Sequence, residues 1–471
     1  MLNWRRPVLA LYDRHIARSP LPAHRQYLAA FHELPVEDRR RVQARNLRRL
    51  LLHAERHVPY YRALLGRLGV VRGDVVDLTR FRDVPLLTRD LLRDRFDDLA
   101  SEDLATRDWY RNASGGSTGE PVAVLQDRDY EAIGTAAIEM HYGWAGRRPG
   151  EPLVRLWGSE RDVLQGGQGW RNRVGGFARN LVFLNSFYMT REGMARYVEV
   201  IQRRRPVVIE AYAESAYELA RYVAETGARI EGVRAVITSA TTLYPFIREE
   251  VERAFGCPVL NRYGSREVGS FAGERRPGAG LDVFTATHWA EVVDEAGRAC
   301  ADGEEGDVVV TCLTNLTMPL IRYRIGDRAV VGESVGSPTP SVERFRSVTG
   351  RSIDTFVRRD GSTVPGYAFV HFLGVVYHSG WIRKAQVVQR GYDDVLIRVV
   401  ASGDPPPGLL ENIRRALQQV VGLACEITFE RVNEIMAQAS GKYRYIISDL
   451  SGDRPFLKPG LSLERPHSGA G

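Results

Sequence analysis

The chain has 471 residues, of which 44% are hydrophobic and 26% charged, and its formal net charge is +7. This length and apolar content are enough to bury a large core and exceed one usual domain, so we expect two domains. The sequence shows no internal repeat, no low-complexity tract, no signal-peptide pattern and no apolar run of about 20 residues, the length that spans a membrane. These features argue against a repeat protein and a membrane protein, and we expect a cytoplasmic location.

An arginine-rich segment comes first along the chain, with basic runs at 39–41 and 48–49. Such runs can indicate nucleic-acid binding. Apolar residues recur at helical spacing in the same segment: Leu47, Leu51, Ala54 and Val58. This spacing predicts an amphipathic helix whose solvent-facing side carries the arginines, so we expect no nucleic-acid partner.

A loop of small residues follows at 114–121, with the sequence Ser-Gly-Gly-Ser-Thr-Gly-Glu-Pro. Glycine lets backbone N–H groups turn toward an anion without a Cβ in the way, and hydroxyl groups add further donors. Neither the Walker A pattern nor the dinucleotide GxGxxG pattern is present. The loop therefore favours phosphate binding, with a surface turn between two strands as the alternative. The residues concerned are Ser114, Gly115, Gly116, Ser117, Thr118 and Gly119.

Strands and helices alternate through the middle of the chain. Apolar runs at 207–209 and 233–237 are typical of strands, and 215–226 is typical of a helix. This alternation predicts a large α/β domain over residues 1–353.

The pattern changes after residue 353. Strand-like runs occur at 385–389, 395–400 and 427–431, with a helix at 409–421 after three consecutive prolines. This order predicts a small α+β domain over residues 354–471. The fold class is therefore α/β, with a large amino-terminal domain and a small carboxyl-terminal one.

Four short polar segments complete the pattern: 261–269 (Asn-Arg-Tyr-Gly-Ser-Arg-Glu-Val-Gly), 323–327 (Tyr-Arg-Ile-Gly-Asp), 350–354 (Gly-Arg-Ser-Ile-Asp) and 440–442 (Ser-Gly-Lys). Lysine is scarce, since only three of the 65 basic residues are lysines: Lys384, Lys442 and Lys458. A lysine is a compact point charge that reaches between two oxygen atoms of a reacting centre, which a planar guanidinium does less well. Lys442 is therefore a candidate catalytic residue, with an ordinary exposed lysine as the alternative.

In this order, the loop at 114–121 and the four segments resemble the adenylate-forming superfamily of acyl-CoA synthetases and adenylation domains. Within that superfamily, the chain looks most like the phenylacetate-CoA ligase and capsule-biosynthesis branch. The resemblance covers most of the chain, including 58–62 (Val-Pro-Tyr-Tyr-Arg) and 237–241 (Ile-Thr-Ser-Ala-Thr). It implies ATP-dependent, Mg²⁺-dependent activation of a carboxylic acid as acyl-AMP, with release of pyrophosphate.

The resemblance also implies a role for each motif in ATP binding. The glycine-rich loop holds the β and γ phosphates, Tyr263 stacks on adenine, and Glu267 binds Mg²⁺. Asp327 grips the ribose hydroxyls, and Arg351 lies near ribose and phosphate. The remaining residues of the implied ATP site are Ser239, Ala240, Thr241, Gly264 and Ser265.

Two further roles concern the carboxyl-terminal domain. The resemblance implies that Asp354 is the hinge of a mobile domain and that Lys442 contacts both the acid and the α-phosphate during adenylation. The implied catalytic set is therefore Lys442, Glu267 and Arg351.

The identity of the acid is not encoded in these motifs. Tyr142, Trp144 and Tyr212 could line a pocket for an aryl or related small acid, and core packing explains them equally well. Coenzyme A is the expected acceptor, giving a thioester. An amine acceptor giving an amide, adenylyl transfer without a thioester, a non-catalytic nucleotide-binding regulatory protein and a homodimeric assembly remain open.

The cysteines point away from a metal site. Cys257, Cys300, Cys312 and Cys425 are far apart and show no CxxC spacing. Some relatives carry a Cys/His cluster after the Tyr-Gly segment, where the stretch 272–291 offers only His288. We therefore expect buried thiols and no zinc.

Overall fold

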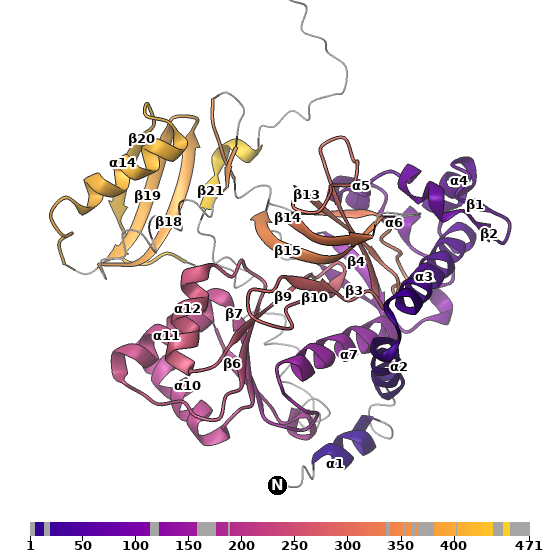
Figure 1. The fold of residues 1–471 in the computed structure, drawn as a ribbon, viewed down its shortest axis with the longest axis horizontal. Helices are drawn as coiled ribbons and strands as arrows, with labels where there is room; N and C mark the ends of the chain where they lie inside the picture. Colours follow the sequence, from indigo (N-terminus) through magenta and orange to yellow (C-terminus); the bar gives the residue numbers. More distant parts are fainter. Residues whose placement is uncertain are drawn as a thin grey trace, which may run out of the picture. The chain divides into compact units, whose positions relative to one another are not determined.

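The structure is a computed structural model of the chain and describes residues 5–13, 19–113, 122–157, 176–186, 189–335, 340–351, 355–359, 363–365, 369, 373, 381–401, 403–436 and 446–452. The chain divides into two compact units, one formed mainly by Met1–Ser352 and one mainly by Ile353–Ile435. Each unit has its own sheet (Figure 1).

The helices of the first unit are α1 (Arg5–Leu11), α2 (Leu21–Glu33), α3 (Val36–His57), α4 (Pro59–Arg67), α5 (Arg89–Asp94), α6 (Phe96–Leu99), α7 (Arg128–Trp144), α10 (Arg191–Arg204), α11 (Ala213–Thr226) and α12 (Pro245–Phe255), with short 3₁₀ turns η2 (Leu78–Asp83) and η3 (Leu104–Thr106). Its strands are β1 (Val71–Arg72), β2 (Val75–Val76), β3 (Trp109–Ala113), β4 (Ala123–Asp127), β5 (Leu153–Trp157), β6 (Leu181–Asn185), β7 (Val208–Tyr212), β8 (Ala235–Ser239), β9 (Val259–Ser265), β10 (Gly269–Gly273), β11 (Leu281–Val283), β12 (His288–Val293), β13 (Glu305–Cys312), β14 (Tyr323–Val335) and β15 (Ser341–Arg351).

One sheet of 11 strands organises the first unit, in the order β12-β13-β14-β15-β11-β10-β9-β8-β7-β5-β6. The strands from β6 to β9 are parallel, and from β9 onward the pairing is antiparallel. The carboxyl ends of parallel strands meet at one edge of a sheet, where α/β proteins bind ligands. The strand β9 therefore joins two kinds of sheet at a position suited to a site.

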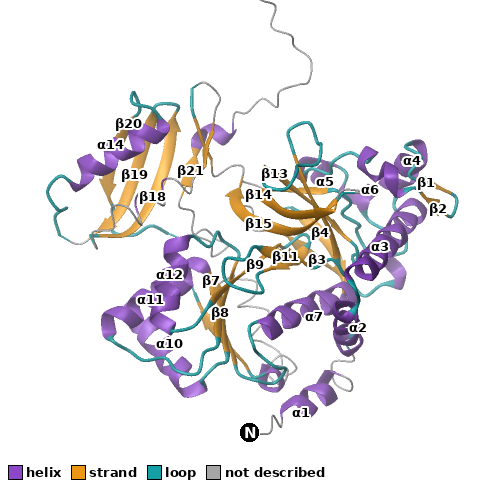
Figure 2. Cartoon of the chain, in the orientation of Figure 1, coloured by secondary structure: helices purple, strands orange, loops and turns teal. Residues whose placement is uncertain are grey.

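Helices cover both faces of the parallel strands (Figure 2). Alternate strand residues such as Ile209 and Val236 pack with Ile201 of α10, Leu219 of α11 and Val251 of α12. The other face packs on α7, through a cluster of Tyr142, Ala145, Leu153, Val208, Ala235, Ile237 and Leu260. Two buried faces explain why these strands read as nearly continuous apolar runs, and the predicted α/β alternation is confirmed.

The arginine-rich segment forms α3, as the spacing of its apolar residues predicts. Leu47, Leu50, Leu51 and Ala54 are fully buried, whereas the arginines at 41, 45, 48 and 49 are exposed. The buried face packs against the antiparallel strands in the largest core cluster. The arginines are therefore the solvent-facing side of an amphipathic helix.

The second unit is a small α+β structure, in agreement with the predicted fold class. Its elements are β16 (Thr355–Val357), β17 (Thr363–Pro365), β18 (Ile382–Gly391), β19 (Asp394–Ala401), α14 (Leu409–Val421), β20 (Glu426–Arg431), β21 (Ile446–Ser448) and the 3₁₀ turn η5 (Asp449–Gly452). Four strands form a sheet in the order β20-β19-β18-β21, and β16 pairs with β17. The predicted helix at 409–421 coincides with α14, which buries Ile413 and Leu417.

All four cysteines are free and buried, as predicted. Among the described residues, none of the helices combines the length and the apolar character needed to cross a bilayer.

Candidate active site

Several predicted site residues lie outside the described part of the chain. They are the loop residues 114–119, the hinge candidate Asp354 and the catalytic candidate Lys442. Arg351 is described by its backbone alone, which pairs with Asp327 across β15 and β14. The remaining predicted residues can be placed.

Tyr263 and Asp327 are in contact. The Tyr263 phenol on β9 donates a hydrogen bond of 2.8 Å to a carboxylate oxygen of Asp327 on β14. The Tyr263 ring also packs against Phe271 and Phe345, with centroid separations of 4.6 and 6.1 Å. The two residues assigned to adenine and to ribose thus come from different strands and adjoin one another.

The end of β8 is strained at the predicted ATP residues. Ala240 has a φ of +74°, a left-handed conformation that costs a non-glycine residue roughly 1–2 kcal/mol. The next residue, Thr241, donates a hydrogen bond of 2.5 Å to Glu214 at the start of α11. Strain of this kind persists where the surrounding structure over-determines it, and it gathers at ligand sites.

The end of β15 approaches the same turn. Gly350 has a φ of +114°, and a Cβ added there would lie 3.6 Å from the hydroxyl of Thr242. Its neighbour Arg351 pairs with Asp327 in the backbone register. The ends of β8 and β15 and the Gly-Asp pair within β14 are therefore brought together, although more than 80 residues separate 242 from 327 in the sequence.

Glu267 is buried beside Arg89, which no motif indicated, and beside Tyr323, the first residue of the 323–327 segment. Its side chain is 2% exposed and accepts hydrogen bonds from Arg89 of α5 at 3.2 Å and from the Tyr323 hydroxyl at 3.4 Å. Burial raises the pKa of Tyr323, so its phenol stays protonated and donates. The Nε atom of Arg89 is buried and has no hydrogen-bond partner among the described residues. A buried carboxylate is tolerated where a cation and hydrogen bonds compensate its loss of hydration, as Arg89 and Tyr323 do here.

The turn that carries Glu267 is tightly packed. A Cβ at Gly264 would lie 2.4 Å from the carbonyl oxygen of Gly269, so only glycine fits this position. Gln126 on β4 donates to the carbonyl oxygens of Arg266 at 2.9 Å and Glu267 at 3.3 Å. The hairpin β3–β4, which flanks the segment 114–121, is thereby tied to the Tyr-Gly motif.

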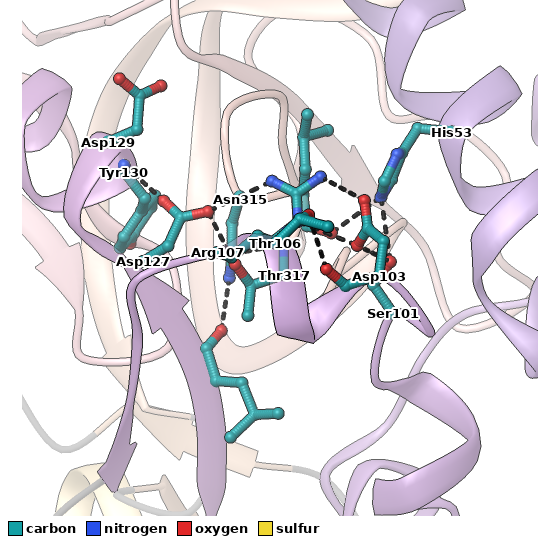
Figure 3. Close-up of polar contacts among 12 residues, drawn as sticks. His53, Ser101, Asp103, Thr106, Arg107, Asp127, Asp129, Tyr130, Asn315 and Thr317 are labelled. Atoms are coloured by element: carbon teal, nitrogen blue, oxygen red, sulfur yellow. Dashed lines mark hydrogen bonds and ion pairs between the residues drawn. The ribbon is translucent and has the colours of Figure 1, made fainter.

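A second polar network holds the start of α7 (Figure 3). Arg107 donates to Asp103 at 2.9 and 2.8 Å and to Asp127 at 3.4 Å. Asp127 in turn accepts from the Tyr130 amide at 2.8 Å, which caps α7, and from the Thr317 hydroxyl at 2.7 Å. This network fixes the end of β4 by charge-assisted hydrogen bonds.

Three potential metal ligands lie at the far side of the same network. The nearest donor atoms of His53, His57 and Asp103 lie within 4.8 Å of one another. However, both Asp103 oxygens already accept from Arg107, which holds the pKa of that carboxyl well below its usual value. His53 Nε2 lies 2.8 Å from the carbonyl oxygen of Leu316, as a donor. These contacts account for Asp103 and His53 without a metal ion.

The three aromatic residues predicted for the acid pocket are not brought together. Tyr212 packs against Trp157, with ring centroids 4.2 Å apart. Tyr142 is buried under the same strands and donates a hydrogen bond of 2.6 Å to Glu210. Trp144, two positions after Tyr142 on α7, lies on a different face of the helix. It packs on Phe284, in the apolar cluster that includes Leu28 of α2. Trp157, which the sequence did not single out, is the aromatic neighbour of Tyr212.

Comparisons with known proteins agree with this arrangement. Residues 356–449 match the family model of the CapK C-terminal domain. The chain is 22% identical to Protein CapK of Staphylococcus aureus, over 80% of this chain and 82% of that protein. It is 25% identical to phenylacetate-coenzyme A ligase of Thermus thermophilus, over 89% of this chain and 99% of that enzyme.

The chain is therefore similar, over most of its length, to proteins of the phenylacetate-CoA ligase and CapK kind. A crystal structure of 2-hydroxyisobutyryl-CoA ligase in the postadenylation state, in complex with R3-HIB-AMP, shares the fold with a TM-score of 0.68 at 22% identity, covering 89% of this chain and 91% of that one. The predicted resemblance to the phenylacetate-CoA ligase and capsule-biosynthesis branch is thereby confirmed. The roles of individual residues in this chain remain predictions.

Proposed function

We propose that the protein activates a carboxylic acid in two steps. In the first, a carboxylate oxygen of the acid attacks the α-phosphorus of ATP, and pyrophosphate leaves with the electron pair of the broken P–O bond. In the second, the thiol of coenzyme A loses its proton, the sulfur attacks the acyl carbon, and AMP leaves. The product is a thioester.

One observation carries the proposal. The described residues assigned to ATP converge from separate strands onto one edge of the sheet, where Tyr263 is bonded to Asp327. The same edge holds the strained Ala240. Because the relatives that match most of the chain include phenylacetate-coenzyme A ligases, an acid is the expected partner of ATP.

The residues of this chain divide the work as follows. Tyr263 and Asp327 bind and orient the nucleoside, because the Asp327 carboxylate can accept from both ribose hydroxyls. The loop at 114–119 binds the phosphates, and Arg351 and Lys442 neutralise charge as pyrophosphate leaves. Phosphoryl transfer needs positioning and charge stabilisation more than covalent help.

Glu267 fits the predicted role of Mg²⁺ ligand. It offers hard carboxylate oxygens, which suit Mg²⁺, and it lies buried beside the Arg89 cation. Glu267 would hold Mg²⁺, which would supply charge neutralisation on the ATP phosphates. Arg89 and Tyr323 both donate hydrogen bonds to this carboxylate.

The domain boundary between residues 353 and 354, the hinge role of Asp354 and a cytoplasmic location are further parts of this proposal. They rest on the resemblance and on the composition of the chain, and each is open to a separate test.

The decisive experiment is Mg²⁺-dependent pyrophosphate release from ATP across a panel of aryl, aliphatic and amino acids, with and without coenzyme A, with products identified by mass. Release with one acid and a thioester that forms only with coenzyme A are the expected results. Release without a thioester would indicate an amine acceptor or a nucleotidyl product. ATP binding without release for any acid would instead indicate a non-catalytic nucleotide-binding protein.

A further inference from the structure

Two successive rows of side chains lie on the α7-facing side of the parallel strands. In the backbone register, Arg155 of β5 pairs with Glu210 of β7, one step before the strand ends. In the next row on the same face, Tyr212 pairs with Ser239 of β8, and the Trp157 ring packs beside Tyr212. Ser239 belongs to the predicted ATP site. The row with Arg155 and Glu210 is therefore the next row along the strands from the row that contains Ser239.

The lower row carries a charge cluster with more positive than negative groups. Glu210 accepts from Arg155 Nε at 2.6 Å, from the Tyr142 hydroxyl at 2.6 Å and from Arg262 Nη2 of β9. Burial alone would raise the pKa of Glu210, but the charges of Arg155 and Arg262 outweigh it and hold that pKa well below its usual value. Glu210 is therefore ionised, and the cluster has one carboxylate for two guanidinium groups.

The excess charge is accompanied by unused donors. The Arg262 side chain is 4% exposed, and its Nε and Nη1 atoms are buried with no hydrogen-bond partner in the described part of the chain. Arg155 uses Nε and Nη2, bonding Glu210 and the Tyr142 hydroxyl, and its side chain is 31% exposed. Buried guanidinium donors without acceptors are costly, so a site that keeps them calls for an acceptor that arrives from outside.

The neighbouring row sets the shape of that ligand. The Trp157 and Tyr212 rings lie side by side as an apolar aromatic pair, tilted by 41° to one another. An apolar surface next to a positive cluster complements a molecule with a flat or apolar body and an anionic end. Two guanidinium groups match a carboxylate in charge, and the Arg262 Nε and Nη1 donors are not used by Glu210.

We propose that the acid activated by this protein carries a second carboxylate, at the end remote from the one that attacks ATP, and that Arg155 and Arg262 bind it. This inference rests on the proposed function and names the substrate class of the same site. A dicarboxylic acid with an aromatic or short apolar body is therefore the preferred substrate.

The test compares acids that differ only in the distal group: 4-carboxyphenylacetate with 4-methylphenylacetate, and adipate with hexanoate. Pyrophosphate release gives kcat/KM for each acid, and calorimetry gives its Kd without turnover. In the wild type, we expect the dicarboxylic member of at least one pair to be preferred by at least about tenfold, as for a charge-assisted pair of hydrogen bonds. Arg155→Met should reduce that preference to about one, and Arg155→Lys should retain part of it.

The matched control is Arg191→Met on α10, an exposed arginine that belongs to the opposite side of the sheet. This variant should keep the wild-type preference. Arg155→Met leaves Arg262 bonded to Glu210, and circular dichroism with thermal melting would show whether it folds.

Failure of the inference and failure of the proposed function give different results. Turnover of the monocarboxylic acids without a gain from the distal carboxylate would overturn the inference and leave the proposed function intact. Absence of pyrophosphate release with every acid, despite ATP binding, would count against the proposed function. In that case the Kd values test the inference. A lower Kd for the dicarboxylic acid than for its monocarboxylic partner, lost in Arg155→Met, supports the inference. Equal Kd values for the two acids, or no binding of either, overturn it.

Discussion

The phenol of Tyr263 donates a hydrogen bond of 2.8 Å to Asp327, although 64 positions separate the two residues in the chain. The bond joins the parallel part of the sheet to its antiparallel part, because Tyr263 lies on β9 and Asp327 on β14. If these residues flank the nucleoside, the bond also orients the carboxylate for the ribose.

The first prediction tests that pair. Asp327→Ala should raise the KM for ATP by about 10- to 100-fold, the range expected for the loss of hydrogen bonds to a charged group. Tyr263→Phe removes only the phenol and should cost less than about tenfold. A double-mutant cycle on ATP affinity measures their coupling, and Tyr392→Phe, an exposed tyrosine of the second unit, is the control. Additive effects of the two changes would show that the bond does not orient Asp327.

The second prediction concerns Glu267 and its cation. Glu267→Gln keeps the shape of the side chain and removes its charge, so the Mg²⁺ concentration for half-maximal adenylation should rise by at least about tenfold. The measurement is a Mg²⁺ titration of pyrophosphate release at saturating ATP. The exposed Glu333→Gln change on β14 should leave the titration unaltered. An unchanged midpoint for Glu267→Gln would assign that carboxylate to the Arg89 contact alone.

The third prediction concerns Lys442. Lys442→Ala should reduce acyl-AMP formation by about 10²- to 10³-fold, the usual loss when one group that stabilises developing charge is removed. ATP binding should persist, since other groups hold the nucleotide. Single-turnover trapping of acyl-AMP and calorimetric ATP binding separate the two effects. Lys384→Ala is the matched control, and a near-normal adenylation rate for Lys442→Ala would contradict the assignment.

The fourth prediction is a loss of stability in mild acid. Burial lowers the pKa of His141 to about 3, with a further contribution from Arg262, and burial lowers that of His288 to about 4. Below the ordinary histidine pKa of about 6.5, the unfolded chain binds protons that these two folded residues do not bind. Stability is therefore full above pH 6.5 and falls as the pH drops toward 4.

Urea unfolding at pH 7, 6 and 5 measures this effect. Each of the two histidines should lower the free energy of unfolding by about 1.4 kcal/mol per pH unit below about pH 6.5. His141→Gln should make the slope shallower, even if the variant is less stable at pH 7. The control is His57→Gln, at a partly exposed position. Equal slopes for the wild type and His141→Gln would rule out this source of acid sensitivity.

Local pattern predicted the elements whose residues interact with near neighbours in the chain. The helix α14 begins and ends where the spacing of apolar residues indicates, and α3 carries its arginines on the solvent side. The predicted helix at 215–226 begins slightly earlier in the structure, at Ala213. Helix termini depend on contacts beyond the helix itself, so their limits are less well determined by periodicity.

The sequence by itself determined the α/β class. Its change of pattern predicts a large and a small part, and its motifs indicate ATP binding. Each depends on residue type and short-range spacing. Only the tertiary structure decided that Trp157 and not Trp144 adjoins Tyr212, that Arg89 pairs with Glu267 from 178 residues away, and that Arg155 and Arg262 share Glu210. Contacts of this kind depend on the register of neighbouring strands and on which face of a helix packs against them. The spacing of residues along the chain does not specify which distant side chain will contact a given residue.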